Sequence, residues 1–191
     1  QRRMSGLIDA ARLVQEGLLP RASPELGGFE IASAFRPADR VSGDLFDHLP
    51  VSNCCVGLAI ADSSGHGLPA ALLARDVITA LRTAAGHGLP VASIVARVNG
   101  VMQHAVLSGT FVTLFYGHLS SDGVLEYCNA GHDPPLVVGG DTVRRLDVGG
   151  AVLGPLPSAR YEGGTTHLEP GDLLVLYTDG ISERTNAAGD Y

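Results

Sequence analysis

The stretch Cys54-Cys-Val-Gly-Leu-Ala-Ile-Ala-Asp-Ser-Ser-Gly-His-Gly-Leu-Pro-Ala-Ala71 decides the fold class of this chain. Its first eight residues form the longest apolar run in the sequence, which predicts a strand buried on both faces. The run ends at Asp62, and a glycine-containing turn leads into a helix with Pro69 near its start. Burying a carboxylate at a strand end is costly unless a cation offsets its charge, so Asp62 is the first candidate functional residue.

The segments around this stretch predict an α+β protein. Helical spacing of apolar residues occurs once before it and twice after it, over 5–19, 68–85 and 91–107. Apolar or alternating patterns predict strands over 29–35, 54–61, 110–119, 124–128, 136–138, 143–146, 165–168 and 172–177. Because two helices precede the later strands and no βαβ alternation occurs, we expect a layered β-sandwich of antiparallel sheets flanked by helices.

The chain is long enough for one domain preceded by a connecting helix. Its 191 residues, 45% hydrophobic and 17% charged, suffice for a substantial core and exclude a disordered chain. Pro20 ends the first helical segment, and a Pro-, Gly- and Ser-rich passage follows it. We therefore expect a linker helix over 1–20 and the domain over 21–191. Because the chain opens on Gln1 and stops at Tyr191, we expect it to be part of a longer protein.

Composition also argues against several classes of protein. The 13 basic residues are all arginine, against 20 Asp and Glu, and the net charge of −7 without a basic run disfavours nucleic-acid binding. The eight-residue apolar run is far shorter than the ~20 residues that a membrane helix needs. Three cysteines make no disulfide framework, and residues 1–4 show no signal-peptide pattern. We therefore expect a soluble, cytoplasmic protein.

Two further carboxylates, Asp44 and Asp179, occupy places similar to that of Asp62, at the ends of apolar segments beside glycines. Three converging carboxylates in a setting without cysteine suit a hard cation, Mg²⁺ or Mn²⁺, rather than structural zinc. Each aspartate taken alone is as well explained by capping a turn or a helix. Taken together, on strand ends that can converge, they favour a metal site.

Two loops carry weaker signals. The N–H groups of Gly65, His66 and Gly67 precede a helix and can bind an anion such as phosphate, but a flexible turn also explains these residues. His66 is a candidate proton donor or phosphate contact, although such a histidine is more often an exposed loop residue. His132, in the tight loop 129–135, is interpreted as bracing its turn rather than as a site residue.

Five motifs, in this order, resemble the PPM-type metal-dependent protein phosphatases, specifically their bacterial SpoIIE/RsbU-like branch. The motifs are Phe35–Asp47, Ala61–Ala71, Thr110–Gly117, Asn129–Pro135 and Leu168–Glu183. Gln15 with Leu18-Leu-Pro20 also resembles the helix that often leads into this domain. Any one motif is a weak match, whereas five in sequence are specific, and the resemblance implies the PPM fold.

The resemblance implies site residues and a mechanism. Asp62 matches the aspartate that bridges two Mn²⁺ or Mg²⁺ ions and activates water, and the backbone carbonyl of Ser63 matches the adjacent ligand. Asp44 and Asp179 match two further metal-site acids. Water then attacks phosphoserine or phosphothreonine without a covalent enzyme intermediate. The implied substrate is a phosphorylated STAS-type anti-sigma-factor antagonist in a bacterial partner-switching pathway, with an upstream sensor domain and a homodimer as further expectations.

Three positions depart from the family pattern. The family has a further Asp-Asp pair on a last strand near its C-terminus, so we expect a chain that stops at Tyr191 to hold an incomplete metal site. Ser42 stands where glycine is usual, which predicts a small, tolerated backbone distortion near Asp44. The phosphate-binding arginine of eukaryotic relatives has no clear counterpart.

Two other functions stay open beside the phosphatase. A phosphatase-like module that only docks partners is favoured by the absent C-terminal aspartate, whereas the retained Asp44, Asp62 and Asp179 argue against it. A two-metal hydrolase of nucleotides or small phosphoesters has no specific feature in its support. The leading hypothesis is therefore a metal-dependent phosphoprotein phosphatase.

Overall fold

Secondary structure follows the apolar pattern over most of residues 2–85 and 88–183, the part of the chain that this computed structural model describes. The helices are α1 (Arg2–Glu16), α2 (Gly67–Ala85), α3 (Val91–Ala105) and α4 (Asp179–Ser182). The strands are β1 (Leu45–Ser52), β2 (Cys55–Ser63), β3 (Val112–Ser120), β4 (Val124–Ala130), β5 (Leu136–Gly139), β6 (Thr142–Arg145), β7 (Gly149–Gly150), β8 (Gly164–His167) and β9 (Leu173–Val175).

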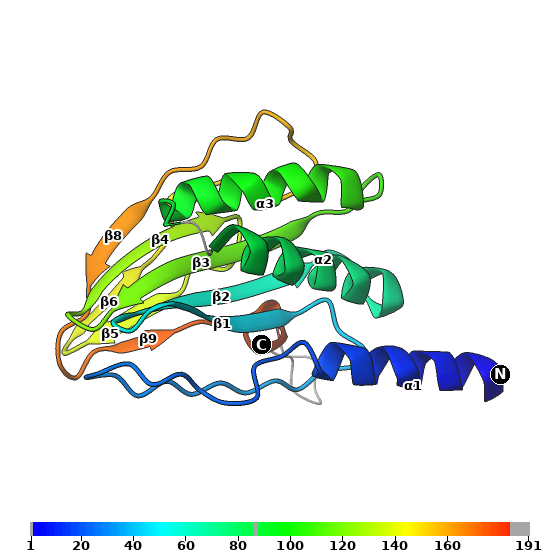
Figure 1. Ribbon diagram of the computed structural model, residues 1–191, viewed down its shortest axis with the longest axis horizontal. Helices are drawn as coiled ribbons and strands as arrows, with labels where there is room; N and C mark the ends of the chain where they lie inside the picture. Colours follow the sequence, from blue (N-terminus) through cyan, green and yellow to red (C-terminus); the bar gives the residue numbers. More distant parts are fainter. Residues whose placement is uncertain (1, 86–87, 184–191) are drawn as a thin grey trace.

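Two sheets and a pair of helices form three layers (Figure 1). The large sheet has the order β1-β2-β3-β4-β7, with β8 also paired to β4, and the small sheet has the order β6-β5-β9. Along β2, Ala59 and Ala61 face the core under α2 and α3, whereas Leu58 and Ile60 face the core under the small sheet. The predicted layered sandwich, and the burial of this strand on both faces, are confirmed.

The prediction of purely antiparallel sheets is wrong at one pairing, because β7 runs parallel to β4. A Cβ on Gly149 would lie 1.8 Å from the carbonyl oxygen of Asn129, so glycine is what lets the two backbones approach. The same approach lets the Asn129 N–H donate to the carbonyl of Val148 at 2.9 Å. The chain is thereby fixed just before the loop 129–135.

The predicted strand over 29–35 is not formed. This segment is extended but pairs with no strand, apart from an isolated bridge between Leu26 and Phe29. Phe29 and Ile31 are partly buried against the core under the small sheet. Their apolar spacing therefore reflects packing onto a finished layer rather than membership of a sheet.

Strand β1 is missed by the sequence pattern because a charged residue occupies one of its inward positions. Leu45, Asp47 and Leu49 alternate on the buried side, and Asp47 is only 2% exposed. Arg82 of α2 compensates this carboxylate through a bond of 2.7 Å from Nε to Oδ2 and one of 3.2 Å from Nη2 to Oδ1. A buried charge with a bidentate partner is tolerated in a core where an unpaired one is not.

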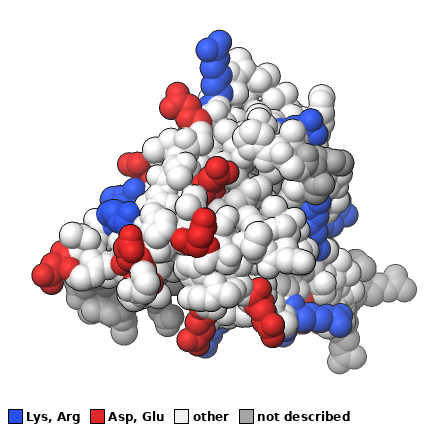
Figure 2. All heavy atoms as spheres, turned by 60° about the vertical axis from the view of Figure 1, so that its left-hand side comes forward, with Lys and Arg blue, Asp and Glu red and all other residues white. Residues whose placement is uncertain are grey.

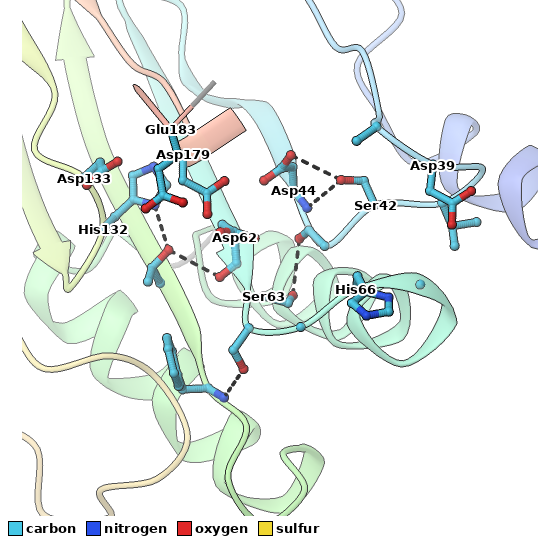
Figure 3. Close-up of a pocket in the computed structure, with 18 of the residues that line it drawn as sticks. Asp39, Ser42, Asp44, Asp62, Ser63, His66, His132, Asp133, Asp179 and Glu183 are labelled. Atoms are coloured by element: carbon cyan, nitrogen blue, oxygen red, sulfur yellow. Dashed lines mark hydrogen bonds between the residues drawn. The ribbon is translucent and has the colours of Figure 1, made fainter. Parts of the chain in front are cut away.

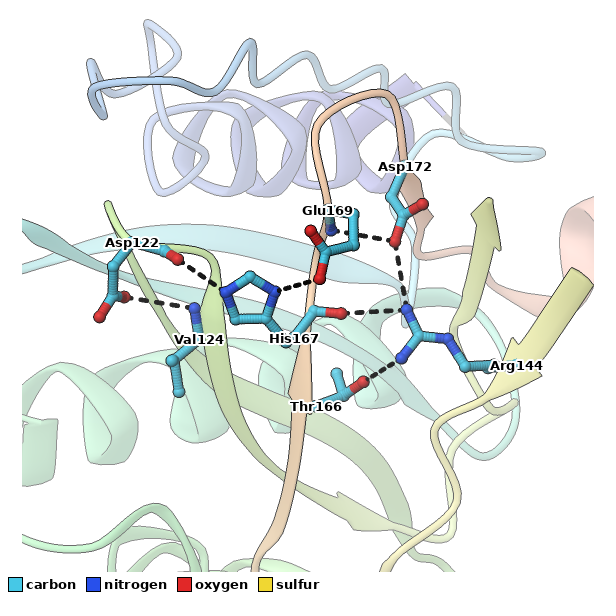
Figure 4. A network of polar contacts seen from close by, with 7 residues as sticks. All are labelled: Asp122, Val124, Arg144, Thr166, His167, Glu169 and Asp172. Carbon is cyan, nitrogen blue, oxygen red and sulfur yellow. Dashed lines mark hydrogen bonds and ion pairs between the residues drawn. The ribbon is translucent and has the colours of Figure 1, made fainter. Parts of the chain in front are cut away.

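A polar network ties the edges of the two sheets together at the end of the molecule away from α1 (Figure 4). Arg144 of β6 donates to Thr166 Oγ1 at 2.6 Å and to the His167 carbonyl at 3.0 Å, both on β8. It also pairs with Asp172 at 3.2 Å. Acidic side chains spread over this end, and arginines lie mostly towards its outline (Figure 2). Because the Arg144 side chain is 44% exposed, water weakens its ion pair, and the network fixes the sheet edges without adding much stability.

The N-terminal helix α1 projects from the opposite end of the sandwich (Figure 1). Its side chains Leu13 and Val14 are 69% and 62% exposed. Among the described residues, no helix combines the length and the apolar character that crossing a lipid bilayer requires.

The close β4–β7 approach generates a stability prediction. Gly149→Ala should lower the free energy of unfolding by roughly 1–3 kcal/mol, because the methyl group meets backbone that cannot move freely. Gly100→Ala is the matched control. Gly100 lies within α3, and apart from its chain neighbours and the adjacent helix backbone nothing lies within 4 Å of the place that an alanine methyl group would occupy, so alanine should stabilise by about 0.5–1 kcal/mol. Urea denaturation checks both, and equal effects of the two substitutions would contradict the packing argument.

Candidate metal centre

The register of β1 against β2 brings the first two candidate carboxylates together. Leu45 lies opposite Ala61 in the ladder. Two residues further along both chains, the Ser63 N–H donates to the Gly43 carbonyl at 3.2 Å. Asp44 and Asp62 lie between these two contacts, directly across the antiparallel pair, where side chains are close neighbours. The pairing that fixes the sheet therefore also fixes the spacing of the two acids.

Glycine at position 43 is required for this approach. A Cβ there would lie 2.8 Å from the Ser63 carbonyl oxygen and 3.2 Å from the Cβ of Ala70 in α2. The absence of a side chain lets Ser63 and its carbonyl sit beside the Asp44 backbone, and Ser63 itself is 1% exposed. Asp44 immediately precedes β1 rather than ending a strand, so the expectation of a strand-end position is wrong for this residue.

The third carboxylate arrives from the small sheet. Asp179 is the first residue of α4, four positions after β9 ends, so it too does not sit at the strand end itself. The segment before it is anchored by His132, whose Nε2–H donates to the Tyr177 carbonyl at 3.1 Å. His132 Nδ1 lies 2.8 Å from the hydroxyl of Thr113, the residue of β3 that is paired with Asp62.

His132 therefore acts as a brace, as the sequence interpretation favoured. It is 5% exposed, and burial lowers its pKa, which favours the neutral ring. With Nε2 donating, a neutral ring accepts the Thr113 proton at Nδ1. Asn129 shapes the loop around it, accepting from the His132 N–H at 2.7 Å and donating to the His132 carbonyl at 3.0 Å.

Asp44, Asp62 and Asp179 converge on one space in the structure (Figure 3). One carboxylate oxygen from each lies within 4.8 Å of the others, a spacing that a shared cation can span. They line a pocket of about 550 Å³ together with the Gly65–Gly67 turn. His66 is exposed and lies apart from the three carboxylates, beside the start of α2. Its contact with phosphate, and metal ligation by the acids and by the Ser63 carbonyl, stay predictions.

Three acids that sequence reasoning did not single out line the same pocket: Asp39, Asp133 and Glu183. Glu183 could have been predicted from helical spacing, since it follows Asp179 by four residues and residues so spaced share a helix face. Asp133 follows His132 in a loop whose course the sequence does not specify. Among the described residues that line the pocket there is no arginine, so its charge is strongly negative.

Burial and mutual repulsion act on the cluster together. Burial, followed by the negative charges of Asp44 and Asp179, raises the pKa of Asp62 to about 7. Burial also raises the pKa of Asp44, against a hydrogen bond from Ser42 that lowers it, and the charge of Asp179 adds to the rise. Ionised together without a cation, these groups destabilise the fold, and an oxygen-seeking divalent ion relieves that repulsion. The donor set therefore fits a hard cation.

The backbone distortion expected at Ser42 is not found. No described residue other than glycine has a positive φ, so serine needs no strained conformation there. Its hydroxyl instead donates to Asp44 Oδ2 at 3.2 Å and accepts from the Asp44 N–H at 3.1 Å. The serine thus orients the carboxylate that follows it.

The raised pKa of Asp62 generates a prediction for the metal-free chain. The pKa of Asp62 in the folded chain lies above the unfolded value of about 4, so the folded state holds this proton more tightly than the unfolded state does. The stability of the fold that depends on protonated Asp62 is therefore fully present below about pH 4 and is lost as the pH rises through about 7. In chelator, Asp62→Asn should therefore be more stable than wild type at pH 8, by a margin that shrinks towards pH 4. Urea denaturation across this range measures the margin, with exposed Asp141→Asn as the control. A margin that does not depend on pH would contradict the repulsion.

Comparison with known proteins agrees with this geometry. The chain is 31% identical over 186 residues to the phosphoserine phosphatase RsbU of Bacillus subtilis, an alignment that covers 96% of this chain and 55% of RsbU. The SiaA-PP2C domain of Pseudomonas aeruginosa superposes with a TM-score of 0.77 at 25% identity, over 94% of this chain and 73% of that domain. The RsbU and RsbW domains of Rv1364c from Mycobacterium tuberculosis superpose with a TM-score of 0.66 at 31% identity, over 83% of this chain and 43% of that one.

The chain thus spans about half the length of RsbU. Residues 52–191 match the profile of one family, named for the Stage II sporulation protein E. This match covers most of the chain and includes β2, α2, the His132 loop and Asp179. The chain therefore belongs to the Stage II sporulation protein E (SpoIIE) family.

Proposed function

We propose that this chain is a metal-dependent phosphoprotein phosphatase that hydrolyses phosphoserine or phosphothreonine. The observation that carries the proposal is the convergence of three carboxylates, with one oxygen of each within 4.8 Å of the others. They line a pocket among whose described residues there is no arginine. A phosphate dianion is repelled by such a pocket unless cations are present. Similarity to RsbU, which is named a phosphoserine phosphatase, supports a phosphoserine substrate.

The proposed ligands are Asp44, Asp62, Asp179 and the Ser63 carbonyl, and the ions are Mn²⁺ or Mg²⁺. Six carboxylates line the pocket, which supports two ions rather than one: Asp39, Asp44, Asp62, Asp133, Asp179 and Glu183. Bound divalent ions supply an acidified water and positive charge for the phosphoryl oxygens. Asp62, which interacts with both Asp44 and Asp179, is the proposed bridge.

The remaining pocket groups favour water as the nucleophile. The Ser63 hydroxyl is buried and donates to the Gly43 carbonyl, and the Ser42 hydroxyl donates to Asp44. The Ser63 hydroxyl thus has a backbone carbonyl, not a base, as its partner, and the partner of Ser42 is a carboxylate that is itself a proposed metal ligand, so neither serine is arranged as an activated nucleophile. The Gly65–Gly67 turn opens α2, and free N–H groups at that helix end suit the phosphate of the substrate. Water therefore attacks phosphorus and the seryl oxygen leaves with a proton.

The proposed substrate is a phosphorylated STAS-type anti-sigma-factor antagonist in a partner-switching pathway. Support comes from the resemblance to the RsbU branch and from the structure that joins RsbU and RsbW domains in one protein. An upstream sensor domain and a homodimer are compatible with α1 projecting from the domain, and both stay predictions.

The test is phosphate release from a phosphoserine-bearing STAS protein. Release should require Mn²⁺ or Mg²⁺, stop in chelator, and fall at least about 100-fold in Asp62→Asn, because a ligand worth several kcal/mol to the transition state is lost. Asp141→Asn, an exposed acid in the β5–β6 turn, should keep wild-type activity.

Each alternative has its own result in the same assay. Release from nucleotides but not from the phosphoprotein would identify a small-phosphoester hydrolase. Binding of the phosphoprotein without release, whatever the metal, would identify a docking module. Either result would overturn the proposed phosphatase.

A further inference from the structure

The side chain of Gln15 makes a two-point contact with the backbone next to the carboxylate cluster. Its Nε2 donates to the Ser42 carbonyl at 2.6 Å, and its Oε1 accepts from the Ser42 N–H at 3.0 Å. Ser42 lies before β1 begins and outside the β1–β2 ladder. The amide of Gln15 thus satisfies the Ser42 backbone as a neighbouring strand would.

Ser42 passes this constraint directly to Asp44. The Ser42 hydroxyl donates to Asp44 Oδ2 and accepts from the Asp44 N–H, so the orientation of the Ser42 backbone sets that of the carboxylate. Gly43, between them, is held from the other side by the Ser63 N–H. The turn 42–44 is therefore fixed between α1 and β2, with no contact made by Gln15 to the carboxylates themselves.

Two further contacts of the described residues hold α1, and the segment just after it, against the domain, one of them two residues before Ser42. Asp9 pairs with Arg40 at 3.1 Å, and Arg82 donates to the Leu18 carbonyl at 2.7 Å. Around Gln15 the helix is exposed: Leu13 and Val14 face solvent, and Arg12 pairs with Glu16 on the surface at 2.7 Å. Gln15 is thus the residue of the exposed C-terminal turn that reaches the 42–44 turn.

We propose that Gln15 is a positioning residue of the metal centre, which holds the Ser42–Asp44 turn so that Asp44 points at the carboxylate cluster. The inference rests on the proposed function, since it assigns Asp44 to a cation. It makes α1 a part of the site, although the helix lies outside the sandwich.

The test is Mn²⁺ binding measured by titration calorimetry on the 191-residue chain. Gln15→Met keeps the length and bulk of the side chain and removes both hydrogen bonds. It should weaken Mn²⁺ binding about tenfold, with the Tm of the metal-free chain close to wild type. In the phosphatase assay it should raise the Mn²⁺ concentration needed for half-maximal rate by a similar factor, with kcat restored at saturating Mn²⁺ and KM for the phosphoprotein unchanged.

Two further variants separate positioning from a loss of helix α1. Arg12→Gln removes a surface pair on the same helix and should bind Mn²⁺ as wild type does. Ser42→Ala removes the hydrogen bond that connects Ser42, held by Gln15, to the Asp44 carboxylate. The losses of Mn²⁺ affinity caused by Ser42→Ala and Gln15→Met should therefore be less than additive in the double variant.

Unchanged Mn²⁺ affinity in Gln15→Met would overturn the inference while leaving the proposed function intact. Equal weakening in Gln15→Met and Arg12→Gln would also overturn it, because helix fraying would then be the cause. A wild-type chain that binds no Mn²⁺ would refute the metal centre and this inference together.

Discussion

Mutual repulsion between Asp44, Asp62 and Asp179 is the constraint around which the described structure is arranged. One carboxylate oxygen from each lies within 4.8 Å of the others, and Asp44 and Asp62 are partly withdrawn from water. Such a group of anions would push its supporting segments apart, so the segments must be anchored elsewhere. There are two anchors: the β1–β2 ladder holds Asp44 and Asp62, and the His132 brace holds the chain that leads to Asp179.

The anchors are effective because β2 is buried on both sides. Helices α2 and α3 cover one face of its sheet, and the small sheet covers the other. Asp62 lies at the end of this rigid strand, so its position is set by two hydrophobic cores rather than by the pocket itself. Apolar packing thus supplies the stability that lets an unfavourable charge cluster persist at one edge, where it can bind cations.

Much of this arrangement could be predicted from residue patterns, and the failures share a cause. The apolar run before Asp62 and the periodic helices follow from hydrophobicity alone, and they were confirmed. Strand β1 was not predicted, because Asp47 faces inward and pairs with Arg82, a residue 35 positions away that no local pattern reveals. The parallel β4–β7 pairing was not predicted, because it depends on glycine, which has no side chain, at position 149.

The same division applies to the site. Asp44, Asp62 and Asp179 stand out because each is an acid at the margin of an apolar segment, whereas their convergence is a property of strand register. Asp133 depends on the course of a loop. The hydrogen bonds between Gln15 and the Ser42 backbone depend on how a helix docks against a turn 27 residues away. Contacts of this kind are long-range in sequence and short-range in space, so only the folded structure shows them.

Anomalous diffraction from crystals of this chain grown with Mn²⁺ is the sharpest test of whether the three carboxylates form a cation site, because it locates the ion without reference to activity. We expect an anomalous peak within coordination distance of Asp44, Asp62 and Asp179, which disappears in Asp62→Asn crystals grown identically. Ordered side chains of all three residues around a space without such a peak, at a Mn²⁺ concentration that saturates binding, would contradict the cation site.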